Sequence, residues 1–313
     1  MILNDFLPVS REDLEKLGWD NVDFVLISGD AYVDHPSFGP AVIGRVLLDA
    51  CFKVGMIAQP DWNDPDSVTV FGKPNLGFLV SAGNMDSMVN HYYVSRRKRQ
   101  TDNYSPGGQM GLRPDRATIV YTNLIRKKYK DDPIIIGGIE ASLRRFAHYD
   151  YWDDTVRRSV LFDSGADLLI YGMGENQVVE VAEYLKNGIE IQYISHIPGT
   201  CFLTESLEML PDYIEIDSFE TVSSDKVAYA KSFKVIYDEQ DPIRGKIIVQ
   251  KHKDRYLVQN PPTMPLERDK LDWTFNLGYQ RDVHPSYLPL GGVPAVQEVK
   301  LSIISERGCF GNC

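Results

Sequence analysis

Two cysteines stand close together in the last five residues of the 313-residue sequence. Cys309 and Cys313 are separated by three residues in the segment Arg307-Gly-Cys-Phe-Gly-Asn-Cys313. Thiolates are the protein ligands of iron–sulfur clusters, and Gly308 and Gly311 would let the backbone wrap closely around a bulky group. The spacing differs from the C-x2-C of thioredoxin-like sites and zinc knuckles. The pair by itself leaves open a cluster-binding set, a redox dithiol, or two free thiols.

A strand is predicted immediately before this pair. Val299, Leu301 and Ile303 alternate with polar residues, which is the pattern of a half-buried strand. Barrel enzymes place their sites on loops at the carboxyl ends of strands. We therefore expect residues 296–313 to begin a barrel that continues beyond Cys313. Residues 204–295 are predicted as a connector with helices and one short hairpin at 246–259.

The first 203 residues alternate buried strands with amphipathic helices. Short apolar runs predict strands at 23–29, 54–58, 78–81, 133–138 and 167–172. Apolar residues at helical spacing predict helices at 39–53, 117–129 and 176–187. Strands that are apolar throughout indicate a parallel sheet covered on both faces. The predicted fold class is α/β, a doubly wound parallel sheet.

Glycine-rich turns follow several of these predicted strands. Gly137-Gly138 and Gly172-Met-Gly174 come directly after strands, and Glu175 begins a helix. Ligands of doubly wound sheets bind beyond the carboxyl ends of the strands, so these five residues are candidate cofactor-binding residues. The alternative is that the glycines serve turns and helix packing, and that Glu175 only favours the helix dipole.

Asp34 and His35, two further candidate cofactor-binding residues, follow the first predicted strand. A histidine there could be a base or a ligand oriented by a neighbouring carboxylate. Alternatively, its ring nitrogens only satisfy loop backbone groups.

Charge is distributed unevenly. The net charge of −11 argues against nonspecific nucleic-acid binding, yet residues 91–160 hold 14 Lys and Arg against 8 Asp and Glu, a net charge of +6. This basic segment either binds RNA or a phosphate-bearing ligand, or is a solvated surface on which Arg144 and Arg145 pair with acids such as Asp150 and Asp153. No apolar run approaches the roughly 18 residues of a membrane helix, and without a signal peptide we expect a cytoplasmic protein with no membrane partner.

Longer motifs extend over almost the whole sequence. They are Asp30–Gly39, Gly137–Arg145, His148–Trp152, Tyr171–Glu175 and Gln259–Pro262. Together with the terminal cysteines they resemble the N-terminal portion of the YgiQ-type (UPF0313) radical S-adenosylmethionine (SAM) proteins, in which a catalytic barrel follows.

The resemblance implies a radical SAM iron–sulfur enzyme of unknown substrate. Cys309 and Cys313 match the first two cysteines of the motif C-x3-C-x2-C, which binds a [4Fe-4S] cluster in that superfamily, and the third would fall three positions beyond Cys313. SAM would bind the open iron and be cleaved to a 5′-deoxyadenosyl radical. The 313-residue piece is expected to be inactive, because a cluster ligand and the barrel are missing. The alternative is a nucleotide-, corrinoid- or RNA-binding α/β module without catalysis.

The α/β domain also resembles the cobalamin-binding domains found ahead of other radical SAM barrels. Gly137-Gly138 and Gly172–Glu175 match their usual pattern. Domains with a lower axial histidine carry D-x-H-x-x-G, whereas here Asp34 and His35 are adjacent and the next glycine is Gly39. This departure favours a retained fold without cobalamin.

Overall fold

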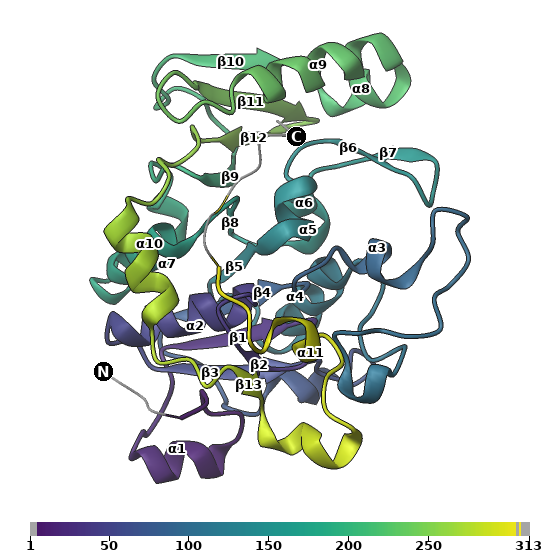
Figure 1. Cartoon of the computed structure of the whole chain (residues 1–313). Helices are drawn as coiled ribbons and strands as arrows, with labels where there is room; N and C mark the ends of the chain where they lie inside the picture. Colours follow the sequence, from purple (N-terminus) through teal and green to yellow (C-terminus); the bar gives the residue numbers. More distant parts are fainter. Residues whose placement is uncertain (1–4, 305–306, 308–313) are drawn as a thin grey trace.

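A nine-stranded sheet runs through the molecule in the computed structural model, which describes residues 5–304 and 307 (Figure 1). Five of its strands form a parallel half in the order β3-β1-β4-β5-β8. They are β1 (Phe24–Ser28), β3 (Val54–Ala58), β4 (Gly77–Ser81), β5 (Ile134–Gly137) and β8 (Leu168–Ile170). Numbered along the chain this order is 2-1-3-4-5, one of the two common doubly wound arrangements. The prediction of an α/β fold with a mostly parallel sheet is confirmed.

Helices cover both faces of this parallel half. α2 (Gly39–Asp49) packs against α7 (Glu175–Lys186), and α4 (Ala117–Lys128) packs against α6 (Val160–Ser164). Right-handed crossovers put α2 and α4 on opposite faces, because the chain moves in opposite directions along the sheet after β1 and after β4. The strands are therefore buried almost throughout, which is why they are apolar on both sides.

Four further strands extend the sheet beyond β8. They are β9 (Thr200–Thr204), β10 (Tyr213–Ile216), β11 (Ile247–His252) and β12 (Arg255–Gln259). β9 is antiparallel to both β8 and β12, and the hairpin of β11 and β12 has the antiparallel pairing expected from sequence. The sheet thus continues across residue 203, where the sequence suggested that a connector begins. α8 (Phe219–Ser224) and α9 (Lys226–Asp238) pack together at this end of the sheet, at the top of Figure 1.

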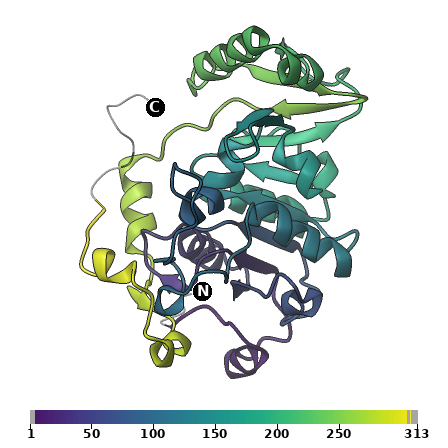
Figure 2. The ribbon, with the colours of Figure 1, turned by 90° about the vertical axis from the view of Figure 1, so that its right-hand side faces the viewer.

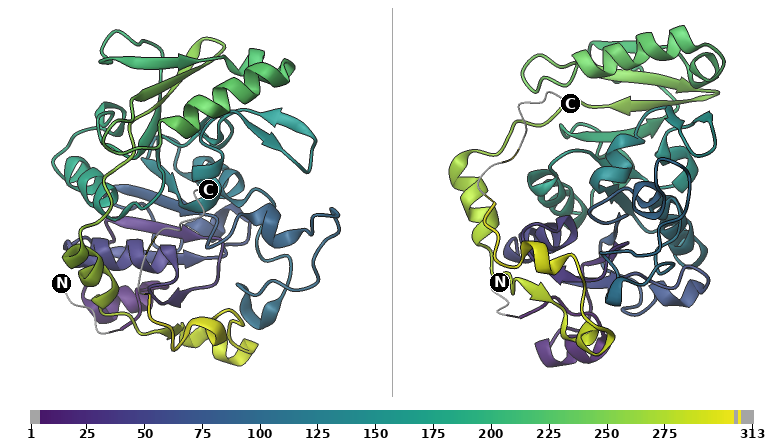
Figure 3. Two further views of the ribbon diagram at one scale, coloured as in Figure 1. Left: turned by 45° about the horizontal axis from the view of Figure 1, so that its top comes forward. Right: turned by 45° about the vertical axis from the view of Figure 1, so that its right-hand side comes forward.

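After β12 the chain returns to the parallel half. It passes through α10 (Arg268–Asn276), and β13 (Asp282–Val283) pairs antiparallel with β2 (Val33–Asp34). Figures 2 and 3 show this returning segment, in yellow-green and yellow, along one side of the molecule. Residues near both ends of the sequence are therefore neighbours in space.

The strand predicted at residues 299–303 is not observed. Val296–Val299 is the short helix α11, and residues 300–304 have no strand structure. Leu301 and Ile303 are 95% and 89% exposed. Strand pairing needs a neighbour that supplies backbone hydrogen bonds, and no strand of residues 5–304 pairs with this segment.

The remaining α-helices and strands are short. They are α1 (Arg11–Leu17), α3 (Ser87–His91), α5 (Gly138–Leu143), β6 (His148–Asp150) and β7 (Thr155–Arg157). Short 3-10 helices are η1 (Pro65–Val68), η2 (Pro106–Gly108), η3 (Ile191–Tyr193) and η4 (Pro285–Leu290). Within the described ranges, none of the helices has the length and apolar character that crossing a membrane requires.

Candidate functional site

A cavity of about 420 Å³ lies near the carboxyl ends of the parallel strands. We call it the switch-point cavity, because it spans β1 and β4, between which the strand order reverses. Its walls are mainly apolar side chains of the strands, α2 and α7, including Leu26, Leu79, Ile135, Ile170, Val42 and Val178. This is the place where doubly wound sheets bind ligands.

The structure brings together five residues that the sequence singled out. Gly137, Gly138, Gly172, Gly174 and Glu175 all line the switch-point cavity. Two of the glycines leave no room for a side chain: a Cβ on Gly138 would lie 2.7 Å from the Ser81 hydroxyl, and one on Gly174 would lie 2.9 Å from Ile170. Gly138 also has a φ of +83°, which favours glycine. The glycines thus serve close packing and also shape the cavity, so the two interpretations left open by the sequence are compatible.

An ion pair closes one side of the cavity. Glu175, the first residue of α7, is only 3% exposed, and its Oε1 lies 2.6 Å from a guanidinium nitrogen of Arg307. The Arg307 guanidinium also lies 4.9 Å from the ring centre of Phe275 on α10. Glu175 Oε2 is buried with no hydrogen-bond partner in the described part of the chain. Glu175 therefore does more than favour the helix dipole, because it holds the residue that precedes the cysteine segment.

The turn after β4 contributes residues that sequence reasoning missed. The Asn84 side chain donates to the Ser37 carbonyl at 2.9 Å and accepts from the Gly39 amide at 3.2 Å. It thereby links the loops that follow β1 and β4, and Ser37, Ser81 and Asn84 all line the cavity. A signal was present, because Ser81-Ala-Gly-Asn84 is also a glycine-containing turn directly after an apolar strand.

Asp34 and His35 do not line the switch-point cavity. Asp34 is buried, pairs with the Arg45 guanidinium of α2, and accepts the backbone amide of Gln280 at 2.8 Å. It thereby attaches the returning segment to α2. His35 is also buried, and its Nδ1 accepts the amide of Ser37 at 3.0 Å. Burial lowers the pKa of His35.

The cavity provides no histidine or cysteine ligand for cobalt among the described residues that line it. His35 lies outside this lining. Its Nδ1 accepts the Ser37 amide, so in the neutral ring Nε2 carries the proton and cannot bind a metal. The residues present therefore do not fit a cobalamin with a lower axial histidine.

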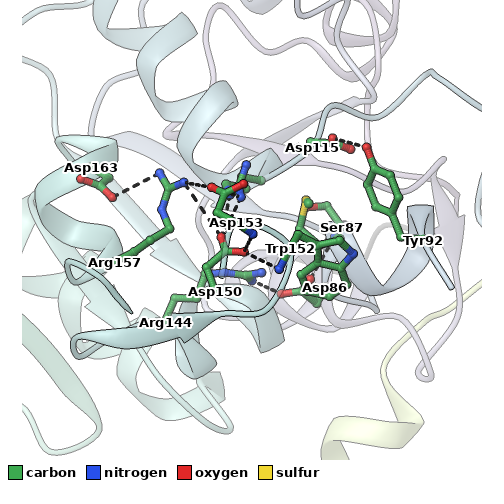
Figure 4. A network of polar contacts seen from close by, with 12 residues as sticks. Asp86, Ser87, Tyr92, Asp115, Arg144, Asp150, Trp152, Asp153, Arg157 and Asp163 are labelled. Carbon is green, nitrogen blue, oxygen red and sulfur yellow. Dashed lines mark hydrogen bonds and ion pairs between the residues drawn. The ribbon is translucent and has the colours of Figure 1, made fainter. Parts of the chain in front are cut away.

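Seven of the fourteen cations of the basic segment form ion pairs within the described residues, and Figure 4 shows several of these pairs. Arg157 lies between Asp153 and Asp163, with contacts of 3.0 and 3.6 Å, and Arg144 pairs with Asp86. Further pairs join Arg113 to Asp30 and Asp102, Arg116 to Asp150 and Asp153, Arg126 to Asp167, Lys128 to Asp66, and Arg158 to Asp163. Arginines here do pair with local acids, as the second interpretation expected, but with other partners.

Arg145 differs from its neighbour Arg144. Its guanidinium donates to the Gln259 side chain at 2.6 Å and lies 4.9 Å from the ring centre of Tyr171. Three of the motifs on which the resemblance rests, Gly137–Arg145, Tyr171–Glu175 and Gln259–Pro262, therefore meet in space at this arginine.

Cys309 and Cys313 lie outside the described residues. Within residues 5–304 and 307, no group of three His, Cys, Asp or Glu side chains could hold a metal ion. The cluster site therefore stays a prediction.

Comparison with known proteins places the chain among radical SAM proteins. The family model described as radical SAM N-terminal matches residues 6–302. A UPF0313 protein from Clostridium perfringens is 58% identical over 311 residues, which is 99% of this chain and 47% of the relative. A UPF0313 protein from Clostridium botulinum is 59% identical over 309 residues, covering 99% of this chain and 48% of the relative. The chain thus spans about half the length of these curated relatives.

Among solved structures, a radical SAM methyltransferase, TsrM, from Kitasatospora setae overlaps with a TM-score of 0.39 and 18% identity. The overlap covers 58% of this chain and 28% of TsrM, which was solved with its tryptophan substrate and a SAM analogue. A structural similarity this low supports no statement about the function of this chain.

Proposed function

The chain belongs to the radical SAM N-terminal family, and on that premise we propose that the full-length protein is a radical SAM enzyme whose α/β part holds a ligand beside the cluster. Cys309 and Cys313 would supply two of the three thiolates for a [4Fe-4S] cluster. When bound, the cluster supplies the electron that cleaves SAM to a 5′-deoxyadenosyl radical. The protein's own part is to bind and orient the substrate and to exclude water.

The ion pair of Glu175 with Arg307 carries this proposal. Glu175 and Arg307 both line the switch-point cavity and lie 2.6 Å apart. Arg307 precedes Cys309 by two residues, and two residues of extended chain span at most about 7 Å. This reach supports the proposal that a cluster bound through Cys309 would meet the cavity at the carboxyl ends of the strands.

The cavity walls indicate the kind of group that the site would take. Most of the walls are aliphatic, while Ser81, Asn84, Glu175 and Arg307 supply a few polar groups. Apolar walls with few polar groups are typical of small-molecule sites. We infer that an apolar part of the substrate occupies the cavity, and that its polar end meets Glu175 Oε2, which has no partner among the described residues.

The proposal is tested by cysteine substitution in the full-length protein. After anaerobic reconstitution, Cys309→Ala and Cys313→Ala should lose the iron–sulfur absorbance and the formation of 5′-deoxyadenosine from SAM. Cys51→Ala is the matched control, because Cys51 lies at the end of α2 and is exposed; it should retain both. A full complement of cluster iron in Cys309→Ala would refute the assignment.

The 313-residue chain alone gives a second test. It carries only two cysteines of the motif, so we expect no stoichiometric [4Fe-4S] absorbance and no SAM cleavage. A stable cluster with SAM cleavage in this chain would show that the ligand set is different.

A further inference from the structure

A second cavity, of about 400 Å³, shares no lining residue with the switch-point cavity. We call it the Trp62 cavity. Its walls include Trp62 from the loop after β3, His91 at the end of α3, Lys98 and Arg99 from the following loop, and Asp115 before α4. The volume is within the range of small-molecule sites, about 300–1,000 Å³.

Lys98 and Arg99, two of the cations that line this cavity, outnumber its one acid among the described lining residues, Asp115, and form no ion pair with it. Lys98 and Arg99 have no ion-pair partner within residues 5–304 and 307. Their charged ends lie over aromatic rings instead, Lys98 at 5.9 Å from the ring centre of Tyr92 and Arg99 at 4.4 Å from that of Tyr93. Other cations of the basic segment also lack an ion pair in the described part of the chain, but of the unpaired cations only Lys98 and Arg99 line this cavity, so they are the ones available to an anion here.

A fixed loop geometry holds the two cations in place. The backbone of Lys98 forms a bridge with Tyr92, and the amide of Arg99 donates to the carbonyl of His91 at 2.7 Å. The Arg99 side chain also donates to the Val89 carbonyl at 3.3 Å. The cations are therefore positioned by the backbone, which lowers the entropy cost of binding.

The one acid that lines the cavity is already engaged. Asp115 Oδ1 lies 2.7 Å from His91 Nδ1, and Oδ2 accepts the Tyr92 hydroxyl at 2.6 Å, a contact drawn in Figure 4. These hydrogen bonds, that of His91 foremost, hold the pKa of Asp115 below its usual value. The contact fixes the His91 ring through Nδ1, and the buried Nε2 has no partner in the part of the chain that the structure describes. A ligand oxygen that reached Nε2 would satisfy this nitrogen.

Trp62 adds a flat apolar surface to the same cavity. It is 39% exposed, and Met110, Pro114 and Val120 complete an apolar side. Indole faces stack on planar rings such as nucleobases, while Lys and Arg bind phosphate oxygens through charge-assisted hydrogen bonds. We propose that the Trp62 cavity binds a small nucleoside phosphate, with its phosphate at Lys98 and Arg99 and its base on Trp62.

The structure favours a small nucleotide over RNA as the occupant. RNA binding needs a run of free cations that follows the backbone. Residues 96–99 are such a short run, but only Lys98 and Arg99 of it line the cavity, together with Trp62 and His91. Lys98 and Arg99 thus line one cavity of limited volume, which suits a small nucleotide. This inference is independent of the switch-point cavity and of the cluster.

Calorimetric titration of the full-length protein with AMP tests the proposal. We expect saturable binding that becomes at least tenfold weaker in Lys98→Ala/Arg99→Ala. The matched control is Lys127→Ala/Lys130→Ala, which removes the same charge from the same basic segment at residues that do not line the cavity; it should change affinity less than twofold. Adenosine and inorganic phosphate should each bind at least tenfold more weakly than AMP.

Several outcomes would overturn the proposal. They are no AMP binding by the unmodified protein, equal losses in the two double variants, or inorganic phosphate binding as tightly as AMP. A short single-stranded RNA that bound tightly where AMP did not would point to RNA instead. Far-UV circular dichroism of both double variants checks that a loss of binding is not a loss of fold.

Discussion

Replacement of Arg113 by methionine should destabilise the folded protein by about 3–5 kcal/mol, the usual cost of removing one partner from a buried ion pair. Arg113 is fully buried and donates to Asp30 at 2.8 Å, to Asp102 at 3.0 Å and to the Ala82 carbonyl at 2.8 Å. Methionine has a similar length, so the volume changes little. Two buried carboxylates and one carbonyl would lose their shared donor.

The loss of stability caused by Arg113→Met depends on pH in a defined direction. Burial raises the pKa of Asp30 to about 6 even with Arg113 beside it. Burial also favours the neutral form of Asp102, but Arg113 holds the pKa of Asp102 below its usual value. Without the guanidinium both pKa values rise, and the carboxyls become neutral as the pH falls. The deficit of Arg113→Met should therefore be largest near pH 7.5 and smaller at pH 5.

Urea unfolding followed by tryptophan fluorescence measures this deficit, with Arg268→Met as control. Arg268 is exposed and lies 3.8 Å from Asp272 on the same helix, and exposed pairs of this kind contribute about 0.5 kcal/mol or less. The triple variant Arg113→Met/Asp30→Asn/Asp102→Asn should recover part of the loss, because it removes the unpaired charges. A loss below about 1 kcal/mol for Arg113→Met, without pH dependence, would refute this reasoning.

Three further predictions concern the same half of the molecule. Gly138→Ala should destabilise the fold by about 1–2 kcal/mol for its positive φ, and by more because the new Cβ would lie 2.7 Å from Ser81. Gly165→Ala is the control, because its φ is +68° and no atom lies within 4 Å of the new Cβ, so it should show the φ cost alone. Equal losses of stability in thermal unfolding would contradict this. Burial raises the folded-state pKa of Asp30 to about 6. Protonation of Asp30 therefore stabilises the fold fully below the unfolded-state pKa of about 3.9, and this contribution is lost as the pH rises through about 6. The difference in unfolding free energy between the native protein and Asp30→Asn should change between about pH 4 and about pH 6, and a difference that is independent of pH would contradict the raised pKa. Glu175→Gln removes the carboxylate charge that pairs with Arg307, and charge-assisted contacts contribute about 1.5–3 kcal/mol. Amide hydrogen exchange near Arg307 should therefore accelerate about tenfold or more, while exchange in β1 stays unchanged. Unchanged exchange near Arg307 would show that the ion pair does not anchor this segment.

The local pattern of apolar residues was sufficient to predict the strands and helices of the parallel half. Apolar runs such as Phe24–Ser28 and the helical spacing in Gly39–Asp49 were correctly assigned, because burial on both faces leaves a clear signal in a short window. The same kind of reasoning was wrong for residues 299–303. Alternating residues form a strand only when a neighbouring strand pairs with them, and the pattern does not contain that information.

By itself, the sequence determined the family, the parallel α/β half and the glycine turns that surround the switch-point cavity. The tertiary structure alone decided that β9 to β12 continue the same sheet, that Arg307 meets Glu175, and that Lys98 and Arg99 line the Trp62 cavity. The physical reason is the distance along the sequence between the residues that interact. Helix and strand formation depend on residues a few positions apart. Strand pairing and the choice of ion-pair partner depend on residues far apart in sequence, 248 positions for Asp34 and Asp282 and 132 positions for Glu175 and Arg307.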